Sequence, residues 1–176
     1  TGGRIENFDN DNILLSIGDY GSRFLAQDKS SVNGKIIKIN INNSDYEIIS
    51  MGHRNPQGLY FDKEKNFLLE TEHGPLGGDE INLIEVDKIN EDDPLNYGWP
   101  IASYGEHYGY PSEDIKYLYE MAPLLKSHKE NGFVEPLDYF VPSIGISDIE
   151  NYQNKLFVAS MGDSVNEGDL TLYIYE

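Results

Sequence analysis

The sequence predicts an all-β fold of the β-propeller type, in which residues 1–176 form about three blades of a single partial propeller domain. Three observations predict it. Short β-prone runs alternate with tight turns, one strand–turn–strand pattern occurs three times, and its first two copies start about 50 residues apart. Hairpins at this period fit propeller blades better than a sandwich. Because propellers close with about four to eight blades, we expect the chain to be an internal piece of a longer propeller.

Each copy of the pattern joins two short apolar strands through a polar turn. The three copies span residues 4–17, 59–70 and 149–160. A loop and then a strand that begins with glycine follow each copy, at residues 34–39, 78–84 and 168–174. The sequence therefore predicts three successive antiparallel strands in each blade.

The third copy comes late because a long excursion, residues 86–140, separates it from the second. Apolar side chains recur there at helical spacing, namely Ile115, Leu118, Tyr119, Ala122 and Leu125. We expect one or two short helices between residues 113 and 130, within an insertion at roughly 105–135. Met121 and the aromatic residues nearby are expected to pack this segment rather than to bind a ligand.

The composition narrows the choice of partners. The chain has 31 acidic and 13 basic residues, a formal charge of -18, which repels phosphate backbones and anionic lipid surfaces. We therefore expect no nucleic acid partner, and cations are favoured. No apolar run reaches the 18 or so residues of a membrane span, and no signal sequence is present, as expected for an internal piece. The absence of cysteine excludes disulfides, cysteine nucleophiles and thiolate metal sites.

Two turns crowded with polar groups, residues 50–59 and 72–80, are the candidate functional segments. Glycine and proline allow a sharp bend that exposes backbone carbonyls, and the Arg, Asn, His and Glu side chains there can hold an anion, a cofactor or a cation. The alternative is that each is an ordinary surface turn.

Three motifs, taken together in this order and spacing, resemble the soluble quinoprotein glucose and aldose sugar dehydrogenases, the glucose/sorbosone dehydrogenase family. They are GHRNPQG at residues 52–58, EHGPLGGDEINLI at 72–84 and NYGWP at 96–100. The resemblance implies a six-bladed, periplasmic or secreted propeller that binds pyrroloquinoline quinone (PQQ) and calcium. It also implies oxidation of the C1 hydroxyl of an aldose to a lactone, with an external electron acceptor. An oligomer is possible, because an open propeller edge needs a covering partner.

The resemblance assigns residues to the cofactor and to its calcium ion. Arg54 and Asn55 match the family's cofactor-contacting pair, and guanidinium and amide donors suit a quinone with three carboxylates. The backbone carbonyls of Gly74 and Pro75 match the ligands of the calcium that polarises the cofactor.

A second, structural calcium region of the family corresponds to Glu80 and to the backbone of Tyr97, with further carbonyls around residues 103–105. The alternative is that Glu80 is a solvated acid at a strand end and that Tyr97 and Trp99 belong to the core.

The histidines and one glutamine receive secondary assignments. His73 and Gln57 lie beside the cofactor positions and could face the substrate, although His73 could equally order its own turn. His53 is expected to brace the loop. His107 and His128 have no ligand partner at recognisable spacing.

Two departures from the family pattern bear on activity. The family's general base is a histidine just before the segment that corresponds to Thr1, so we assign no catalytic residue in this chain and expect these 176 residues to be inactive by themselves. Glucose dehydrogenases also carry a lysine where this chain has Gly162. Two alternatives therefore stay open: a non-catalytic binding propeller of the same family, and a calcium-dependent lactonase-like propeller, against which the Arg54–Asn55 pair argues.

Overall fold

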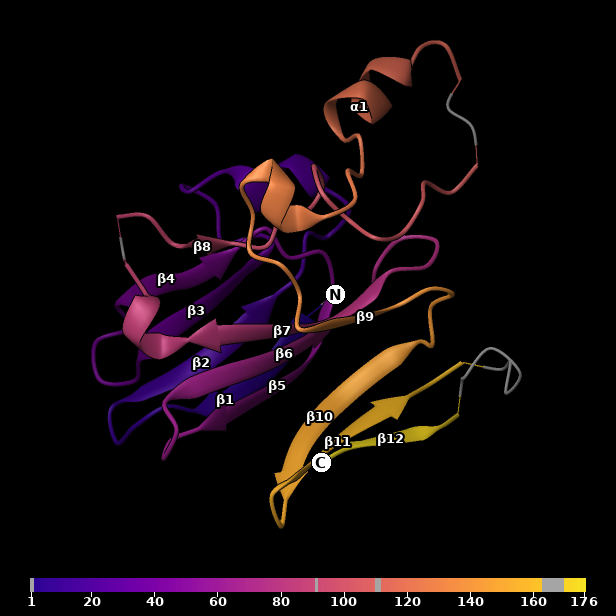
Figure 1. The fold of residues 1–176 in the computed structure, drawn as a ribbon. Coiled ribbons are helices and arrows are strands. Elements are labelled where there is room, and N and C mark those ends of the chain that lie inside the picture. The colour runs from indigo at the N-terminus through magenta and orange to yellow at the C-terminus, as the bar shows by residue number, and fades with distance from the viewer. Residues whose placement is uncertain (1, 91, 110–111, 163–169) are drawn as a thin grey trace.

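The computed structural model describes residues 2–90, 92–109, 112–162 and 170–176, which form three sheets (Figure 1). The first sheet has the order β1 (Gly2–Asn7), β2 (Asn12–Ile17), β3 (Lys35–Asn40), β4 (Tyr46–Met51) and β8 (Leu95–Asn96). The second has the order β5 (Pro56–Asp62), β6 (Phe67–Glu72), β7 (Asp79–Glu85) and β9 (Asp138–Phe140). The third consists of β10 (Ile146–Tyr152), β11 (Lys155–Ser160) and β12 (Leu172–Tyr175).

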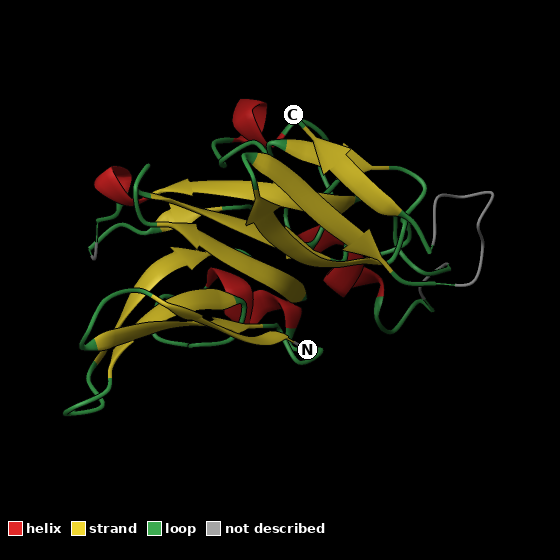
Figure 2. Cartoon of the chain, turned by 90° about the horizontal axis from the view of Figure 1, so that it is seen from below, coloured by secondary structure: helices red, strands yellow, loops and turns green. Residues whose placement is uncertain are grey.

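The three sheets lie side by side as successive blades, and Figure 2 shows the same arrangement from below. Strands within each blade run in chain order and pair antiparallel, except that β8 pairs parallel with β4. β5, the first strand of the second blade, contacts β1 and β10, the first strands of its neighbours. The predicted all-β partial propeller of three blades is confirmed.

The predicted strands are found in the structure, except that the start of one lies outside the described residues. Three further strands were not predicted. Each strand–turn–strand copy is a hairpin, and β3 and β7 are the first two glycine-led strands. The third of these is β12, whose predicted start at Gly168 and Asp169 lies outside the described residues. The sequence did not predict β4, β8 and β9, because two of them are only two or three residues long and β4 begins among polar residues.

The turn between β10 and β11 shows how local sequence fixes a hairpin. Tyr152 pairs with Lys155, so the loop has two residues, Gln153 and Asn154, with φ of 52° and 60°. Positive φ at both positions is the type I′ geometry that matches the right-handed twist of the flanking strands.

The core lies between the blades, and neighbouring residues of β6 serve different interfaces. Leu68 packs in a cluster with Leu14 and Ile36 of the first blade, whereas Leu69 packs with Ile146 and Val158 of the third. Successive side chains of a strand point to opposite faces, so the central blade buries both of its faces.

The excursion after β7 contains the short helices η2 (Val86–Lys88), α1 (Lys116–Met121) and η3 (His128–Asn131), and η1 (Arg23–Gln27) lies between β2 and β3. The prediction of one or two helices between residues 113 and 130 is confirmed. The expectation that Met121 packs is wrong for this chain, because α1 projects away from the sheets and leaves Met121 55% exposed (Figure 1). Among the described residues, no helix is both long and apolar enough to cross a membrane.

Candidate functional site

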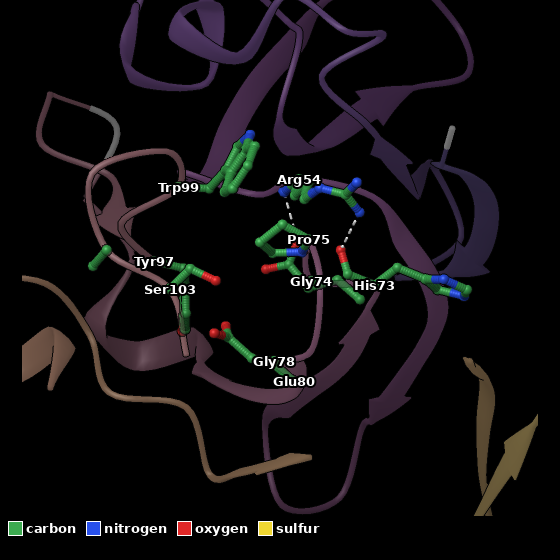
Figure 3. A pocket seen from close by; sticks show the side chains of 11 residues that line it. Arg54, His73, Gly74, Pro75, Gly78, Glu80, Tyr97, Trp99 and Ser103 are labelled. Carbon is green, nitrogen blue, oxygen red and sulfur yellow. Dashed lines mark hydrogen bonds between the residues drawn. The ribbon is translucent and has the colours of Figure 1, made fainter. Parts of the chain in front are cut away.

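The polar turns predicted to carry the site meet at one end of the first two blades. Glu72 pairs with Pro56 on one side and with Glu80 on the other, so the β4–β5 and β6–β7 turns are neighbours. The third motif joins them through β8, since the amide of Tyr97 donates to the carbonyl of Met51 at 2.9 Å. Segments far apart in the sequence therefore form one site (Figure 3).

Glycine is required at two positions of these turns. Gly52 has φ of +78°, and a Cβ atom there would lie 2.2 Å from Asn96 Oδ1. A Cβ atom on Gly74 would lie 2.1 Å from the carbonyl oxygen of Gly78. A side chain at Gly52 would push away the motif that contains Asn96, and a side chain at Gly74 would distort its own turn.

Arg54 links the two turns. Its Nη1 donates to the carbonyl of His73 at 2.8 Å, and its guanidinium lies 5.5 Å from the centre of the Trp99 ring (Figure 3). Trp99 is held in turn by a 2.8 Å hydrogen bond from its Nε1 to Asp19 Oδ2. The neighbouring Asn55 accepts a hydrogen bond from Gln57 Nε2 at 2.8 Å. The predicted anion-binding pair is thus half-buried and positioned by its surroundings.

A cavity of about 10 Å³ lies beneath the β6–β7 turn, enough for about one water molecule or one ion. Gly74, Pro75, Glu80 and Tyr97, the four residues predicted to bind calcium, all line it (Figure 3). Arg54, Glu72, His73, Gly78, Trp99, Ala102 and Ser103 complete the lining.

Glu80 is only 5% exposed, so the alternative of a solvated strand-end acid is wrong. Burial, and after it the carboxylate of Glu72, raise the pKa of Glu80 well above its usual value, while a hydrogen bond with the Asn82 side chain opposes the shift. Tyr97 and Trp99 are buried, as expected if they belong to the core, yet both also line the cavity. A buried carboxylate facing a small cavity among backbone oxygens suits a hard cation.

A second cavity, of about 250 Å³, adjoins the first and shares Arg54, Pro75 and Trp99 with it. Arg23 of η1 also lines the second cavity, with its guanidinium 5.8 Å from the Trp99 ring. Its Nη1 is buried and has no hydrogen-bond partner in the described part of the chain. Two guanidinium groups on one aromatic ring, one with an unsatisfied donor, suit a planar anionic ligand.

Backbone carbonyls of residues 103–105, expected near the structural calcium, bond to a lysine. The ammonium of Lys126 donates to Ser103 and Tyr104 at 3.1 Å each and to Gly105 at 2.5 Å, and lies 3.0 Å from Glu106 Oε1. A cation from within the chain therefore holds these three oxygens. Sequence reasoning missed Lys126, which lies in the insertion more than 20 residues away.

The two residues predicted to face the substrate lie at the edge of the site. The ring of His73 points away from the small cavity (Figure 3). Its Nε2 is buried and has no hydrogen-bond partner among the described residues, so that atom does not order its own turn. Gln57 is half-buried, and its amide is bonded to Asn55.

The other three histidines have identifiable partners. His53 is fully buried, with Nε2 2.8 Å from Ser50 Oγ and its ring stacked on Tyr97, as expected of a residue that braces the loop. The ring of His107 is 2.8 Å from the carbonyl of Ala122. His128, for which no ligand partner was expected, has its Nε2 3.4 Å from Oε1 of Glu80 in β7.

Sequence reasoning also missed Glu72, the centre of the hydrogen bonding at this end of the sheet. Its Oε2 accepts the backbone N–H groups of Arg54 at 2.5 Å and of Asn55 at 3.3 Å. The only available signal was its place at the end of an apolar strand, directly before His73.

Gly162, where the family carries a lysine, is exposed just after β11, and the adjoining Asp163 lies outside the described residues.

Comparisons with known proteins found matches over most of the chain. The Glucose / Sorbosone dehydrogenase family profile matches residues 1–168. Aldose sugar dehydrogenase YliI of Escherichia coli (strain K12) is 30% identical over 183 residues, covering 92% of this chain and 45% of that protein.

Two solved structures have the same fold over most of the chain. The soluble aldose sugar dehydrogenase of Escherichia coli in its apo-form has a TM-score of 0.68 and 29% identity, covering 90% of this chain and 47% of that one. The PQQ-bound form of aldose sugar dehydrogenase from Streptomyces coelicolor has a TM-score of 0.62 and 26% identity, with coverages of 91% and 42%. The chain thus spans less than half the length of these relatives.

Proposed function

Because the chain belongs to the Glucose / Sorbosone dehydrogenase family, we propose that the protein is a sugar dehydrogenase that uses PQQ and calcium to oxidise the C1 hydroxyl of an aldose to a lactone. An external acceptor takes the electrons, and the protein works in the periplasm or outside the cell. The observation that carries the proposal is the 2.8 Å hydrogen bond from Arg54 to the carbonyl of His73, the residue before Gly74 and Pro75. It joins the anion-binding and the cation-binding halves of one site.

The cofactor half fits a planar ligand with several carboxylates. Arg54 and Arg23 approach the Trp99 ring, and the adjoining cavity of about 250 Å³ presents the unsatisfied Nη1 of Arg23. In the proposal, the two guanidinium groups neutralise carboxylates of PQQ, and Asn55 adds an amide contact. When bound, the quinone supplies the two-electron acceptor that no amino-acid side chain provides.

The metal half fits calcium because its donors are oxygens. In the proposal, carbonyls of Gly74 and Pro75 would hold the ion at the cofactor, on the side of the larger cavity that Pro75 also lines. Glu80 and the backbone of Tyr97 would bind a second, structural calcium ion in the small cavity. Glu80 is buried beside Glu72, so a dication there would offset charge that the protein has taken out of water. His73 and Gln57 lie on the substrate side in this proposal.

The proton transfer is assigned to a histidine that these 176 residues do not contain. His53 and His128 are buried and His107 is held by Ala122, so none of these three is placed to receive a proton from a sugar. We therefore propose that residues 1–176 bind ligands but do not turn over by themselves.

A second candidate is a propeller of the same family that binds carbohydrate or protein without redox chemistry. Gly162 favours it, since a glycine supplies no cation at the exposed position after β11. The lactonase-like alternative is weaker, because such an enzyme does not need the Arg54–Asn55 pair that the proposal assigns to a polycarboxylate.

The deciding experiment follows dye reduction by the intact protein supplied with PQQ and calcium, with glucose and other aldoses as substrates. We expect turnover that depends on both additions and falls by at least about 100-fold in Arg54→Ala, which loses charge-assisted hydrogen bonds. A Lys63→Ala variant, on the exposed β5–β6 hairpin, controls for the loss of one positive charge. Turnover no higher than that of Arg54→Ala would overturn the dehydrogenase proposal and leave the binding propeller.

A further inference from the structure

Beneath the turn that carries Arg54 lies a buried polar cluster outside the proposed cofactor and calcium ligands. It consists of His53, Glu70, Glu72 and Asn82, and each of the four is at most 3% exposed. One ligand atom from each of His53, Glu70 and Glu72 lies within 4.8 Å of the others. Glu70 and Glu72 project from the same face of β6, at alternate positions of the strand.

The cluster brings two buried carboxyl groups against a single imidazole. Among the described residues, the ion-pair partner of both carboxylates is the imidazole of His53, and neither carboxylate pairs with a lysine or an arginine. Asn82 Nδ2 donates to Glu70 Oε2 at 3.0 Å and to Glu72 Oε1 at 3.2 Å. A neutral amide satisfies hydrogen bonds but does not offset buried negative charge, and burial, with Glu72 beside it, raises the pKa of Glu70 well above its usual value.

His53 is oriented toward these carboxylates without bonding to them. Its Nε2 is 2.8 Å from Ser50 Oγ and its ring stacks on Tyr97, whereas its buried Nδ1 has no hydrogen-bond partner among the residues that the structure describes. Nδ1 lies 3.5 Å from Glu72 Oε1 and 3.7 Å from Glu70 Oε2, both long for hydrogen bonds. The second oxygen of Glu70, Oε1, is also buried and unsatisfied.

The two distances from His53 Nδ1, 3.5 and 3.7 Å, are close to the edges of a metal coordination shell, and all three ligand atoms lie within 4.8 Å of one another. An ion with bonds of about 2.0–2.2 Å at tetrahedral angles holds adjacent ligands about 3.3–3.6 Å apart. A metal-binding imidazole usually engages its other nitrogen in a hydrogen bond, as His53 does with Ser50, and metal-binding carboxylates usually accept outer hydrogen bonds, as here from Asn82. Glu70 Oε1 can complete the shell as the second oxygen of the same carboxylate.

We propose that His53 Nδ1, Glu70 and Glu72 bind a divalent transition-metal ion of the zinc type. An imidazole with two carboxylates suits zinc or manganese, whereas calcium takes oxygen ligands and belongs to the neighbouring cavity under Gly74, whose lining includes Glu72. The ion is structural, because the cluster is buried and Glu72 extends from it to the backbone of Arg54 and Asn55. The site does not depend on the sugar chemistry.

The test measures zinc binding to the intact protein, purified without a histidine tag, stripped with chelator and returned to saturating calcium. We expect one tightly bound zinc ion by calorimetry and by elemental analysis after gel filtration. Glu70→Gln keeps the shape of the side chain and removes one anionic ligand, so we expect its zinc affinity to fall at least about 10-fold. Calcium binding should not change. Glu64→Gln, on the exposed hairpin at the other end of β6, is the matched control and should bind zinc like the wild type.

Two results would overturn the proposal: no zinc or manganese bound by the wild type in saturating calcium, or equal affinity in Glu70→Gln and the wild type. If Glu70→Gln does not fold, X-ray absorption of the zinc-loaded wild type decides the question. One nitrogen ligand and a remainder of oxygens supports the site, and a shell made only of oxygens excludes it.

Discussion

The carboxylate of Glu72 accepts the backbone N–H of Arg54 at 2.5 Å, so the last residue of β6 fixes the turn that carries the proposed cofactor-binding arginine. The same oxygen accepts the N–H of Asn55 at 3.3 Å. A carboxylate that accepts two consecutive backbone donors holds a turn more firmly than a neutral acceptor would, because charge-assisted hydrogen bonds are the stronger ones.

Replacing Glu72 should loosen this turn. Glu72→Ala leaves two backbone donors without an acceptor and opens a cavity, so we expect the free energy of unfolding to fall by about 2–4 kcal/mol. Glu72→Gln keeps one acceptor oxygen and should lose about half as much. Urea unfolding in EDTA measures both, which keeps metal binding out of the comparison. If Glu72→Ala lowers the free energy of unfolding no more than the exposed Glu64→Ala does, Glu72 does not stabilise this turn.

Arg23 should act with Arg54 on the anionic cofactor. Arg23→Met removes a guanidinium whose buried Nη1 has no partner among the described residues, so we expect the dissociation constant for PQQ to rise about 10- to 100-fold. Stability should change little, because no hydrogen bond of that atom is lost. Quenching of Trp99 fluorescence measures binding, with Trp99→Phe as the blank. Lys29→Met, on an exposed side chain, is the charge-matched control, and an equal effect there would contradict a local role.

The polar turns could be located from the sequence because their chemistry is local. Gly52 and Gly74 occupy positions where a Cβ atom would collide with neighbouring backbone or side chain, and such positions select glycine regardless of the rest of the fold. Strand alternation likewise placed β5, β6 and β7. With the register of these strands, the convergence of the β4–β5 and β6–β7 turns follows from hairpin geometry.

The groups that complete the site could not be predicted, because they come from segments whose sequence has no regular hydrophobic pattern. Lys126 and His128 reach the site from an insertion that returns over β7, and their partners are 20 to 48 residues away in sequence. Glu72 was overlooked for a different reason. A glutamate at a strand end usually lies in solvent, and only the packing of the first blade against the second buries this one.

Lys35 gives a pH dependence with a defined sign. Its buried ammonium donates to the carbonyls of Leu25, Ala26 and Asn33 and thereby anchors η1. Burial lowers the pKa of Lys35 to about 8, and the carboxylate of Asp28 opposes this shift. The unfolded chain keeps this proton up to about pH 10.4, so between about pH 8 and 10.4 the unfolded state binds more protons and stability rises with pH. We expect a gain of about 1–2 kcal/mol relative to Lys35→Met over this window. Urea unfolding at pH 7.5, 9 and 10 tests it, and a constant difference between the two proteins would contradict it.

Lys126 should make the loop of residues 103–105 independent of added cations. Lys126→Met leaves three carbonyl oxygens without their donor, and because the lysine is partly exposed we expect a modest loss of about 1–2 kcal/mol. Part of this loss should return when calcium is added, since the freed carbonyls can then bind an ion. Thermal unfolding with and without calcium measures both effects, with Lys116→Met on α1 as the control. Equal calcium responses in the two variants would mean that these carbonyls do not bind the ion.

Glu80 should reverse its contribution to stability when calcium binds. Without the ion, Glu80→Gln removes a buried carboxylate beside Glu72, so the variant should be more stable than the wild type by about 1–2 kcal/mol. With calcium at about 100 times its dissociation constant, the wild type gains about 2.7 kcal/mol from binding, and the variant, which lacks the anionic ligand, gains much less. The order of the two melting temperatures should therefore invert between EDTA and calcium. Glu85→Gln, at the exposed far end of β7, should follow the wild type in both conditions. Parallel responses of Glu80→Gln and the wild type would show that Glu80 is not a calcium ligand.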